Sequence, residues 1–153
     1  RGSGSPAALD WLIDALELQA DDVLLDSGAG VGGPASYAGQ RRGTRALLVE
    51  PEAGACRASA TLFGLPVVQA SGSALPVADR AVDAAWSLGV LCTMHDQLGL
   101  LTELRRVVRR PGRVGLLVYL ATRHIPDDEL PEGNHFPTAA SLEGLFAESG
   151  FAV

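Results

Sequence analysis

Short apolar runs alternate with amphipathic stretches along most of the chain. Five runs have the length and the aliphatic character of buried strands, at residues 22–26, 45–49, 66–69, 83–88 and 113–120. The stretches between the first three runs, and between the last two, carry apolar residues at helical spacing. Because consecutive parallel strands need long crossover connections, this order predicts an α/β fold with a parallel sheet and helices on both faces.

Helix boundaries are marked by capping residues. Helices are predicted to start near Pro6, Pro34, residue 52, Asp96 and Thr138. The expected stops are Gly43, Gly64, Pro111 with Gly112, and Gly150. Residues 121–137 contain three prolines and four acids, and we expect an irregular loop there that acts as a lid.

Length and charge limit the possible functions. The chain has 153 residues and 47% hydrophobic content, which predicts one domain at 6–153 preceded by a tag remnant or flexible lead at 1–5. The net charge is −6 and all 12 basic residues are arginine, so we expect no nucleic-acid partner. The arginines between 105 and 113 are interpreted as a solvated helix face near a helix C-terminus.

Cysteine usage and hydropathy indicate the compartment. Cys56 and Cys92 lack metal-ligand spacing, and we expect no metal site. The sequence shows neither a signal peptide nor a long apolar span, so we expect no membrane partner and a cytoplasmic location.

The segment 23–34 reads as a buried strand, a glycine turn and a helix start. Its glycines permit positive φ and close approach of a ligand to the backbone, which predicts a nucleotide-type pocket. Gly28, Gly30 and Gly33 also fit the dinucleotide fingerprint, with Glu50 as its ribose-binding acid. A carboxylate at Asp26, however, would repel a pyrophosphate and attract an amino group and a sulfonium, and this favours S-adenosylmethionine.

Several motifs resemble the class I S-adenosylmethionine-dependent methyltransferases. The D-x-G-x-G-x-G spacing from Asp26 to Gly32 resembles their motif I, and residues 47–51 resemble the second strand with its ribose-binding acid. Residues 74–83, 84–91 and 101–113 resemble the approach to the fourth strand, that strand, and the helix and turn that lead to the fifth. The resemblance covers roughly residues 20 to 120 and implies a Rossmann-like sheet with S-adenosylmethionine as cofactor and S-adenosylhomocysteine as product.

The resemblance also implies a set of cofactor-binding residues. Asp26 is expected to hold the amino end of the ligand, Glu50 the ribose hydroxyls, and Pro51 the adenine face. Ser71 stands where many relatives carry an aspartate that binds the adenine amino group. The full expected set is Asp26, Ser27, Gly28, Ala29, Gly30, Glu50, Pro51, Ser71, Gly72, Ser73, Ser87, Leu88 and Gly89.

The expected reaction is methyl transfer to a small molecule. The motif I extension 32–35 is similar to that of enzymes that act on sterols and tocopherols. His95 follows the fourth strand and is the candidate catalytic base, because histidine exchanges protons near neutral pH. Two alternatives stay open: a nicotinamide-dependent oxidoreductase, and a non-catalytic module that holds the cofactor or acts through partners.

The C-terminal boundary carries a further expectation. The chain ends at Val153, where the family would begin its sixth strand, so the hairpin of the sixth and seventh strands is expected to be missing. Residues 114–120 would then form an apolar sheet edge, which folded proteins rarely leave open. We therefore expect either a truncated chain or self-association through this edge.

Overall fold

A five-stranded parallel sheet forms the centre of the molecule. The computed structural model describes residues 4–153, so most of the predicted lead at 1–5 lies outside the described residues. The strand order is β3-β2-β1-β4-β5. The strands are β1 (Val23–Ser27), β2 (Arg45–Glu50), β3 (Val67–Gln69), β4 (Ala84–Leu88) and β5 (Val114–Leu117).

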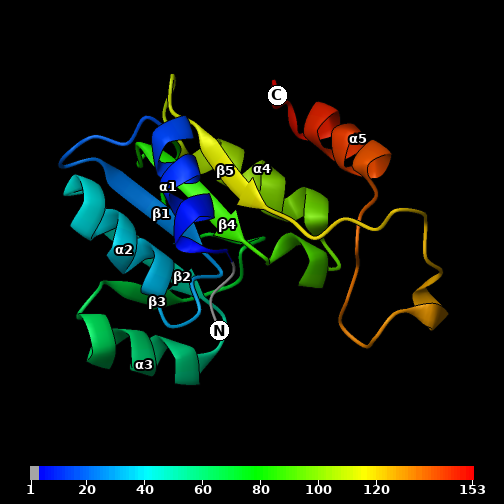
Figure 1. The fold of residues 1–153 in the computed structure, drawn as a ribbon, viewed down its shortest axis with the longest axis horizontal. Helices are drawn as coiled ribbons and strands as arrows, with labels where there is room; N and C mark the ends of the chain where they lie inside the picture. The colour runs from blue at the N-terminus through cyan, green and yellow to red at the C-terminus, as the bar shows by residue number, and fades with distance from the viewer. Residues whose placement is uncertain (1–3) are drawn as a thin grey trace.

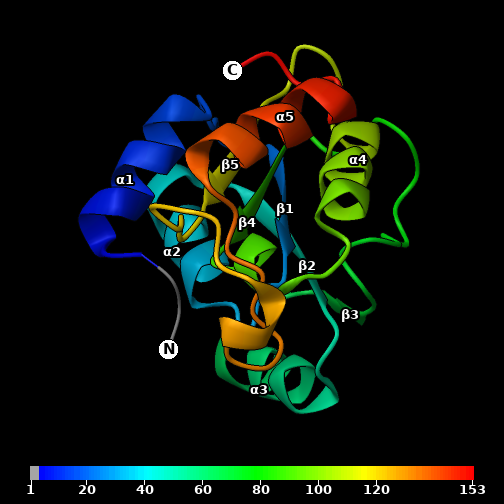
Figure 2. The same cartoon turned by 90° about the vertical axis from the view of Figure 1, so that its right-hand side faces the viewer.

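Helices cover both faces of this sheet, as Figures 1 and 2 show. One face carries α1 (Pro6–Ala15) and α2 (Gly33–Arg42), and α3 (Ala53–Phe63) lies beside α2. The other face carries α4 (Gln97–Val107), against which α5 (Ala139–Ser149) packs. The predicted Rossmann-like architecture is therefore confirmed.

The central strands β1 and β4 are mostly apolar because both of their faces are covered. Leu25 belongs to the core cluster beneath α4, whereas Leu24 belongs to the cluster beneath α1 and α2. Trp86 of β4 is fully buried in that second cluster. Since successive strand residues face opposite sides, Asp26 projects to the same face as Leu24.

Predicted capping residues are found at the N-terminal and the C-terminal ends of the helices. The side chains of Ser5, Asp96 and Thr138 accept hydrogen bonds from backbone N–H groups in the first turns of α1, α4 and α5. Gly43 and Gly150 adopt the left-handed conformation at the ends of α2 and α5.

Two predicted boundaries are wrong, and strand pairing explains both. β5 ends at Leu117 rather than at 120 because its partner β4 ends at Leu88, which pairs with Leu117. α4 ends at Val107 rather than at Pro111, since the next residue, Val108, forms a parallel bridge with Val82. Two 3-10 turns were also not predicted: η1 (Leu91–Thr93) and η2 (Asp127–Glu129), the second within the proline-rich loop.

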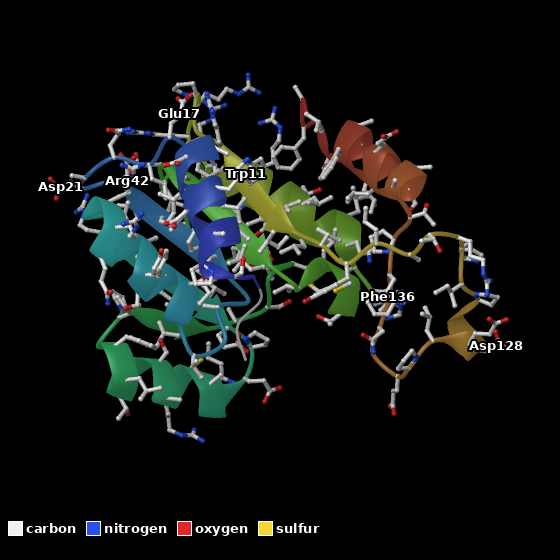
Figure 3. The ribbon with its side chains drawn as sticks, in the orientation of Figure 1. Trp11, Glu17, Asp21, Arg42, Asp128 and Phe136 are labelled. Atoms are coloured by element: carbon white, nitrogen blue, oxygen red, sulfur yellow. The ribbon has the colours of Figure 1, made fainter. Side chains whose placement is uncertain are left out.

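An apolar groove lies beside β5, which is an edge strand among the described residues. The groove has a volume of about 270 Å³ and runs between α1, β5 and the C-terminal segment. Trp11, labelled in Figure 3, lines it and is 67% exposed. Its other apolar lining includes Leu16, Leu116, Phe146 and Phe151.

Candidate functional site: a cavity at the switch point of the sheet

The order of the strands reverses at β1, because β2 and β3 lie on one side of it and β4 and β5 lie on the other. Open α/β sheets place their ligands at the carboxyl ends of strands where the order reverses in this way. A cavity of about 360 Å³ lies at this point. It is lined by Asp26, Gly28, Ala29, Gly30, Val31, Gly33, Pro34, Leu88, Gly89 and Val90.

The sequence predicted six of these ten lining residues. Asp26, the turn residues 28–30, and Leu88 with Gly89 are brought together as expected. Val31, Gly33, Pro34 and Val90 were missed, although each directly continues a predicted segment of the site. The remaining predicted residues do not line this cavity, and their positions are described below.

The amides of the glycine turn are already engaged. Gly28 and Ala29 donate hydrogen bonds from their backbone nitrogens to the carbonyl oxygen of Val49, at 2.8 and 3.2 Å. The backbone nitrogen of Gly30 donates to Oε2 of Glu50 at 2.7 Å. A pyrophosphate site instead directs such amides at the ligand. This turn is therefore poorly suited to a dinucleotide, and a ligand that approaches its backbone meets three amides that already have protein acceptors.

Two glycines of the turn are required for different reasons. Gly28 has φ +77°, and a Cβ there would lie 2.3 Å from Cγ2 of Val90. Gly30 has φ +55°, but a Cβ there would meet no atom within 4 Å, because the position faces open space. Gly28 therefore allows the turn to pack against Val90, and Gly30 leaves room in the cavity.

Asp26 is a buried carboxylate without a hydrogen-bond partner in the part of the chain that the structure describes. It is 1% exposed, and its Oδ2 atom has no hydrogen-bond partner within residues 4–153. The pKa of Asp26 is raised to about 7, mainly because the carboxyl is buried, and the nearby Glu50 contributes in the same direction. The indole of Trp86 acts in the opposite direction, although its nitrogen forms no hydrogen bond of good geometry.

The unpaired carboxylate of Asp26 determines whether the site suits a ligand of the S-adenosylmethionine type. An unpaired buried anion is unfavourable unless a cationic group neutralises it. The side chain lines the cavity and is not turned to bulk solvent. A ligand with an amino group and a sulfonium would supply the missing positive charge, so the site fits.

Glu50 is also buried, so it is not a solvated turn residue. It is 6% exposed at the end of β2. Its Oε1 accepts a hydrogen bond from the backbone nitrogen of Glu52 at 2.9 Å, while Oε2 holds Gly30. Each carboxylate oxygen keeps a second lone pair for a ligand hydroxyl. Pro51, next to it, is exposed.

The loop 71–73 packs directly against the end of β1. A Cβ on Gly72 would lie 2.9 Å from Oγ of Ser27, so only glycine allows this approach. Ser71 and Ser73 form a hydrogen bond between their hydroxyls at 3.0 Å. Ser87 does not line the cavity; its hydroxyl donates to the backbone oxygen of Ser27 at 2.9 Å and joins β4 to β1.

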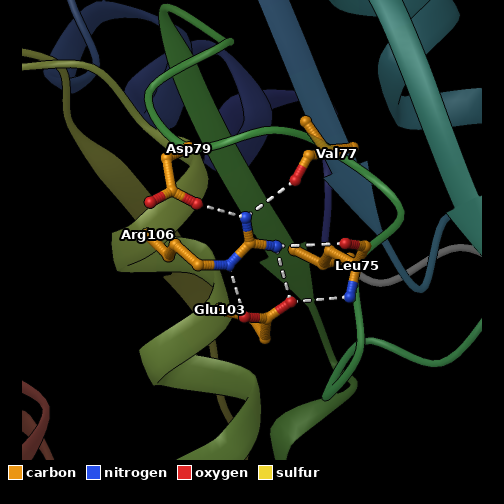
Figure 4. Close-up of polar contacts among 5 residues, drawn as sticks. All are labelled: Leu75, Val77, Asp79, Glu103 and Arg106. Atoms are coloured by element: carbon orange, nitrogen blue, oxygen red, sulfur yellow. Dashed lines mark hydrogen bonds and ion pairs between the residues drawn. The ribbon is translucent and has the colours of Figure 1, made fainter.

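Arg106 fixes the segment that follows this loop, as Figure 4 shows. Its guanidinium donates to the backbone oxygens of Leu75 and Val77 at 3.0 and 2.8 Å, and to Asp79 at 2.7 Å. Glu103 accepts two further bonds from Arg106 and one from the backbone nitrogen of Leu75 at 2.7 Å. These bonds lower the pKa of the Glu103 carboxyl.

The interpretation of this arginine cluster as a solvated face is therefore wrong for Arg106, whereas Arg109 and Arg113 are exposed and form surface ion pairs. Arg106 anchors a loop, Arg109 forms an ion pair with Asp83 at 2.6 Å, and Arg113 pairs with Glu17. The partners lie 26 to 96 residues away in sequence, which explains why local pattern did not identify them.

His95 lies in a second pocket and not in the cavity at Asp26. This pocket has a volume of about 250 Å³ and is also lined by His124 and His135. The ring centroids of His95 and His135 are 5.2 Å apart in an edge-to-face arrangement. The sequence did not indicate that the loop 121–138 would bring these side chains together.

The described residues hold neither a metal-binding cluster nor a membrane-spanning helix. No group of three or more metal-binding side chains is arranged for an ion within residues 4–153. No helix in this part of the chain has the length and apolar character needed to span a bilayer.

Comparison with known proteins gives a consistent result. Residues 25–116 match the family model described as a methyltransferase domain. Among similar solved structures is phosphoethanolamine N-methyltransferase 2 from Haemonchus contortus with S-adenosylhomocysteine, at TM-score 0.85 and 14% identity. Geranyl diphosphate C-methyltransferase from Streptomyces coelicolor, also with S-adenosylhomocysteine, has TM-score 0.79 and 20% identity. The [4+2]-cyclase SpnF has TM-score 0.82 and 22% identity.

These three matches cover 98%, 94% and 94% of this chain, in the order given. The chain in turn spans 38%, 59% and 56% of their lengths, which is less than two thirds in each case. The family match covers most of the sheet, including the glycine turn and β4. The chain therefore belongs to the methyltransferase-domain family, with the class I S-adenosylmethionine-dependent methyltransferase fold.

Proposed function

We propose that this domain transfers a methyl group from S-adenosylmethionine to a small-molecule acceptor. The observation that carries the proposal is Asp26, a buried carboxylate without a hydrogen-bond partner among the described residues, which lines the cavity at the switch point. The engaged amides of the glycine turn add support, because they leave the turn poorly suited to a diphosphate.

Each element of the site has a proposed role in holding the ligand. Asp26 binds the amino end, and Glu50 accepts hydrogen bonds from the ribose hydroxyls with its remaining lone pairs. Pro51 packs on the adenine face, and residues 71–73 follow the edge of the base. Leu88 and Gly89 form the wall on the β4 side. Ser27 and Ser87 keep β1 and β4 together through their own hydrogen bond.

The chain contributes alignment, exclusion of water and a base. When bound, S-adenosylmethionine supplies a methyl group on a positively charged sulfur, which is already electrophilic. In the proposed step His95 accepts the proton of the acceptor hydroxyl. The oxygen lone pair forms the bond to the methyl carbon, and the carbon–sulfur electron pair remains on sulfur. S-adenosylhomocysteine leaves, and the imidazolium returns its proton to water.

Calorimetric titration tests cofactor choice. We expect S-adenosylhomocysteine and S-adenosylmethionine to bind and NADH not to bind. Asp26→Asn should remove most of the affinity, whereas Asp14→Asn, which changes an exposed carboxylate on α1, should leave it unchanged. Tight NADH binding, or full affinity of Asp26→Asn, would refute the proposal.

A turnover assay distinguishes an enzyme from a non-catalytic module. The protein is incubated with S-adenosylmethionine and a panel of metabolites, and release of S-adenosylhomocysteine is measured. Cofactor binding without turnover on any acceptor would favour the non-catalytic alternative. The similar [4+2]-cyclase is a reason to analyse the products as well, since one fold serves several chemistries.

We also propose a cytoplasmic location. Cys56 and Cys92 are both free thiols in the structure. Free cysteines of this kind are typical of proteins kept in a reducing compartment.

A further inference from the structure

All three histidines of the chain line one pocket. His95 comes from the connection between β4 and α4, while His124 and His135 come from the loop that follows β5. The remaining lining includes Ile125, Leu130 and Phe136. The pocket thus combines polar imidazole rings with apolar walls, the composition typical of a small-molecule site.

Hydrogen bonds to backbone atoms of the loop hold it in place, so the imidazole rings are not needed to anchor it. The backbone nitrogen of His135 donates to the oxygen of Cys92 at 2.7 Å. The side-chain amide of Gln97 donates to the oxygens of His135 and Leu91, at 2.5 and 2.9 Å. At the base of the loop, Ala121 donates to the oxygen of Pro137 at 2.9 Å.

This pocket and the cofactor cavity are lined by residues that are close together in sequence. Leu88, Gly89 and Val90 line the cavity, and His95 and Gln97 line the histidine pocket a few residues later. In Figure 2 the loop after β5 lies in front of the sheet, on the side to which the carboxyl ends of the strands point. Asp128 and Phe136, labelled in Figure 3, mark this loop.

The charges of the loop restrict what the pocket can take. Residues 121–138 contain four acids, Asp127, Asp128, Glu129 and Glu132, against a single arginine, Arg123. That arginine lies 3.9 Å from Glu129, so its charge is already partly balanced. Asp128, Glu129 and Glu132 do not line the pocket itself, but the net negative charge of the loop disfavours the approach of an anionic acceptor.

The imidazole rings also limit the chemical class of acceptor that the pocket suits. Proton transfer to a base is most effective when the acidity of the donor is close to that of the base. Phenols and enols meet this condition far better than aliphatic alcohols. Aromatic or conjugated ring systems also suit the apolar walls and the edges of the histidine rings.

We propose that the pocket formed by His95, His124 and His135 binds the methyl acceptor, and that this acceptor is an uncharged phenolic or enolic hydroxyl compound. This inference rests on the proposed methyltransferase function. It assigns polar contacts with the acceptor to His124 and His135, and it leaves the base role to His95.

Imidazole NMR signals of the untagged protein provide the test, because the chain contributes only three. We use 2-naphthol as probe, with 2-naphthoate and 2-methylnaphthalene as its anionic and hydroxyl-free counterparts. 2-Naphthol should shift all three signals saturably, and each counterpart should bind at least about tenfold more weakly. A separate titration with S-adenosylhomocysteine is carried out on the same samples.

Two variants replace an imidazole ring by a phenyl ring, which removes the polar nitrogen atoms and keeps an aromatic side chain. His95→Phe and His135→Phe should each weaken 2-naphthol binding about tenfold while S-adenosylhomocysteine binding stays within twofold. Gln40→Phe, at an exposed position on α2, controls for an added aromatic ring and should change neither affinity.

The outcomes separate the two proposals. If S-adenosylhomocysteine does not bind the native protein, the proposed function fails. If it binds but 2-naphthol moves no imidazole signal, the acceptor inference is overturned. Equal binding of 2-naphthoate, or full 2-naphthol affinity in both histidine variants, overturns it as well.

Discussion

The carboxylate of Glu50 accepts a hydrogen bond from the backbone nitrogen of Gly30, with 2.7 Å between Oε2 and that nitrogen. The residue assigned to the ribose is therefore also a support of the glycine turn. In Glu50→Gln one carboxylate oxygen becomes an NH₂ group that faces a backbone donor, Gly30 or Glu52. We expect the free energy of unfolding to fall by about 2 kcal/mol and the affinity for S-adenosylhomocysteine to fall at least about tenfold.

Urea denaturation and calorimetry measure these two effects. Glu52→Gln changes an exposed neighbouring acid and serves as the control. Unchanged binding in Glu50→Gln would show that the turn does not depend on this carboxylate.

The pKa of Asp26 gives the ligand-free protein a specific pH dependence. The folded-state pKa is raised from 3.8 to about 7, so between these values the folded protein keeps a proton that the unfolded chain has lost. The stabilisation from this proton is complete below pH 4 and is lost as the pH rises through 7. A shift of about three pKa units corresponds to about 4 kcal/mol.

Asp26→Asn should remove this contribution. Denaturation without ligand at pH 5 and pH 8 should show a smaller loss of stability in Asp26→Asn than in the native protein, with the variant the more stable of the two at pH 8. The variant would thus gain stability and lose cofactor binding. Identical pH slopes in the two proteins would contradict the assignment, and Asp14→Asn controls for loss of a surface charge.

Two glycine substitutions should separate packing from ligand space. Gly28→Ala places a Cβ 2.3 Å from Val90, whereas Gly30→Ala enters open space in the cavity. Both carry the strain of a positive φ, about 1 kcal/mol. We expect Gly28→Ala to lower the melting temperature substantially more, and Gly30→Ala to lose S-adenosylhomocysteine affinity with a smaller loss of stability. Equal melting temperatures would show that Val90 moves aside.

Arg106 should control cofactor affinity from outside the cavity. Arg106→Lys replaces a planar group with several donors by one point charge, which cannot hold Leu75, Val77 and Asp79 together. We expect stability to fall by about 2 kcal/mol and S-adenosylhomocysteine binding to weaken because the loop 71–79 loses its anchor.

A neighbouring arginine on the same helix provides the matched control for this effect. Arg105 donates to the backbone oxygen of Gly150 and lies over the ring of Phe151, so Arg105→Lys should affect the packing of α5 and leave cofactor affinity unchanged. Equal binding losses in both variants would mean that the effect is general destabilisation.

Self-association at β5 remains a prediction. The outer edge of this strand and the groove with Trp11 are exposed in the described residues. We expect light scattering to show mass that increases with protein concentration, and Trp11→Lys to reduce it. Leu62→Lys, at a similarly exposed position on α3, should not change it. A constant monomer mass over the whole range would refute self-association.

Local sequence signals were sufficient for most of the fold. The aliphatic runs around Leu25 and Leu48 and the caps at Asp96 and Thr138 depend on neighbours a few residues away, and the structure contains them as predicted. The glycine turn with Asp26 was recognisable for the same reason, since its chemistry lies within a short segment.

What the sequence did not reveal depends on distant contacts. The direction of the turn amides is set by Val49 and Glu50 on the next strand. The role of Arg106 is set by Leu75 and Asp79, and the meeting of His95 with His135 is set by a loop forty residues later. Such pairings follow from tertiary packing and leave no periodic pattern in the chain.

The segment from Leu88 to Gln97 forms part of the walls of both pockets. Any displacement of this stretch therefore alters the cavity at Asp26 and the histidine pocket together. A ligand that binds in one pocket and orders this segment would raise the affinity of the other pocket for its ligand. By thermodynamic linkage, each ligand would raise the affinity for the other by the same factor. The nine peptide bonds of this segment would then be enough to couple the binding of the two ligands, and no separate closing domain would be needed.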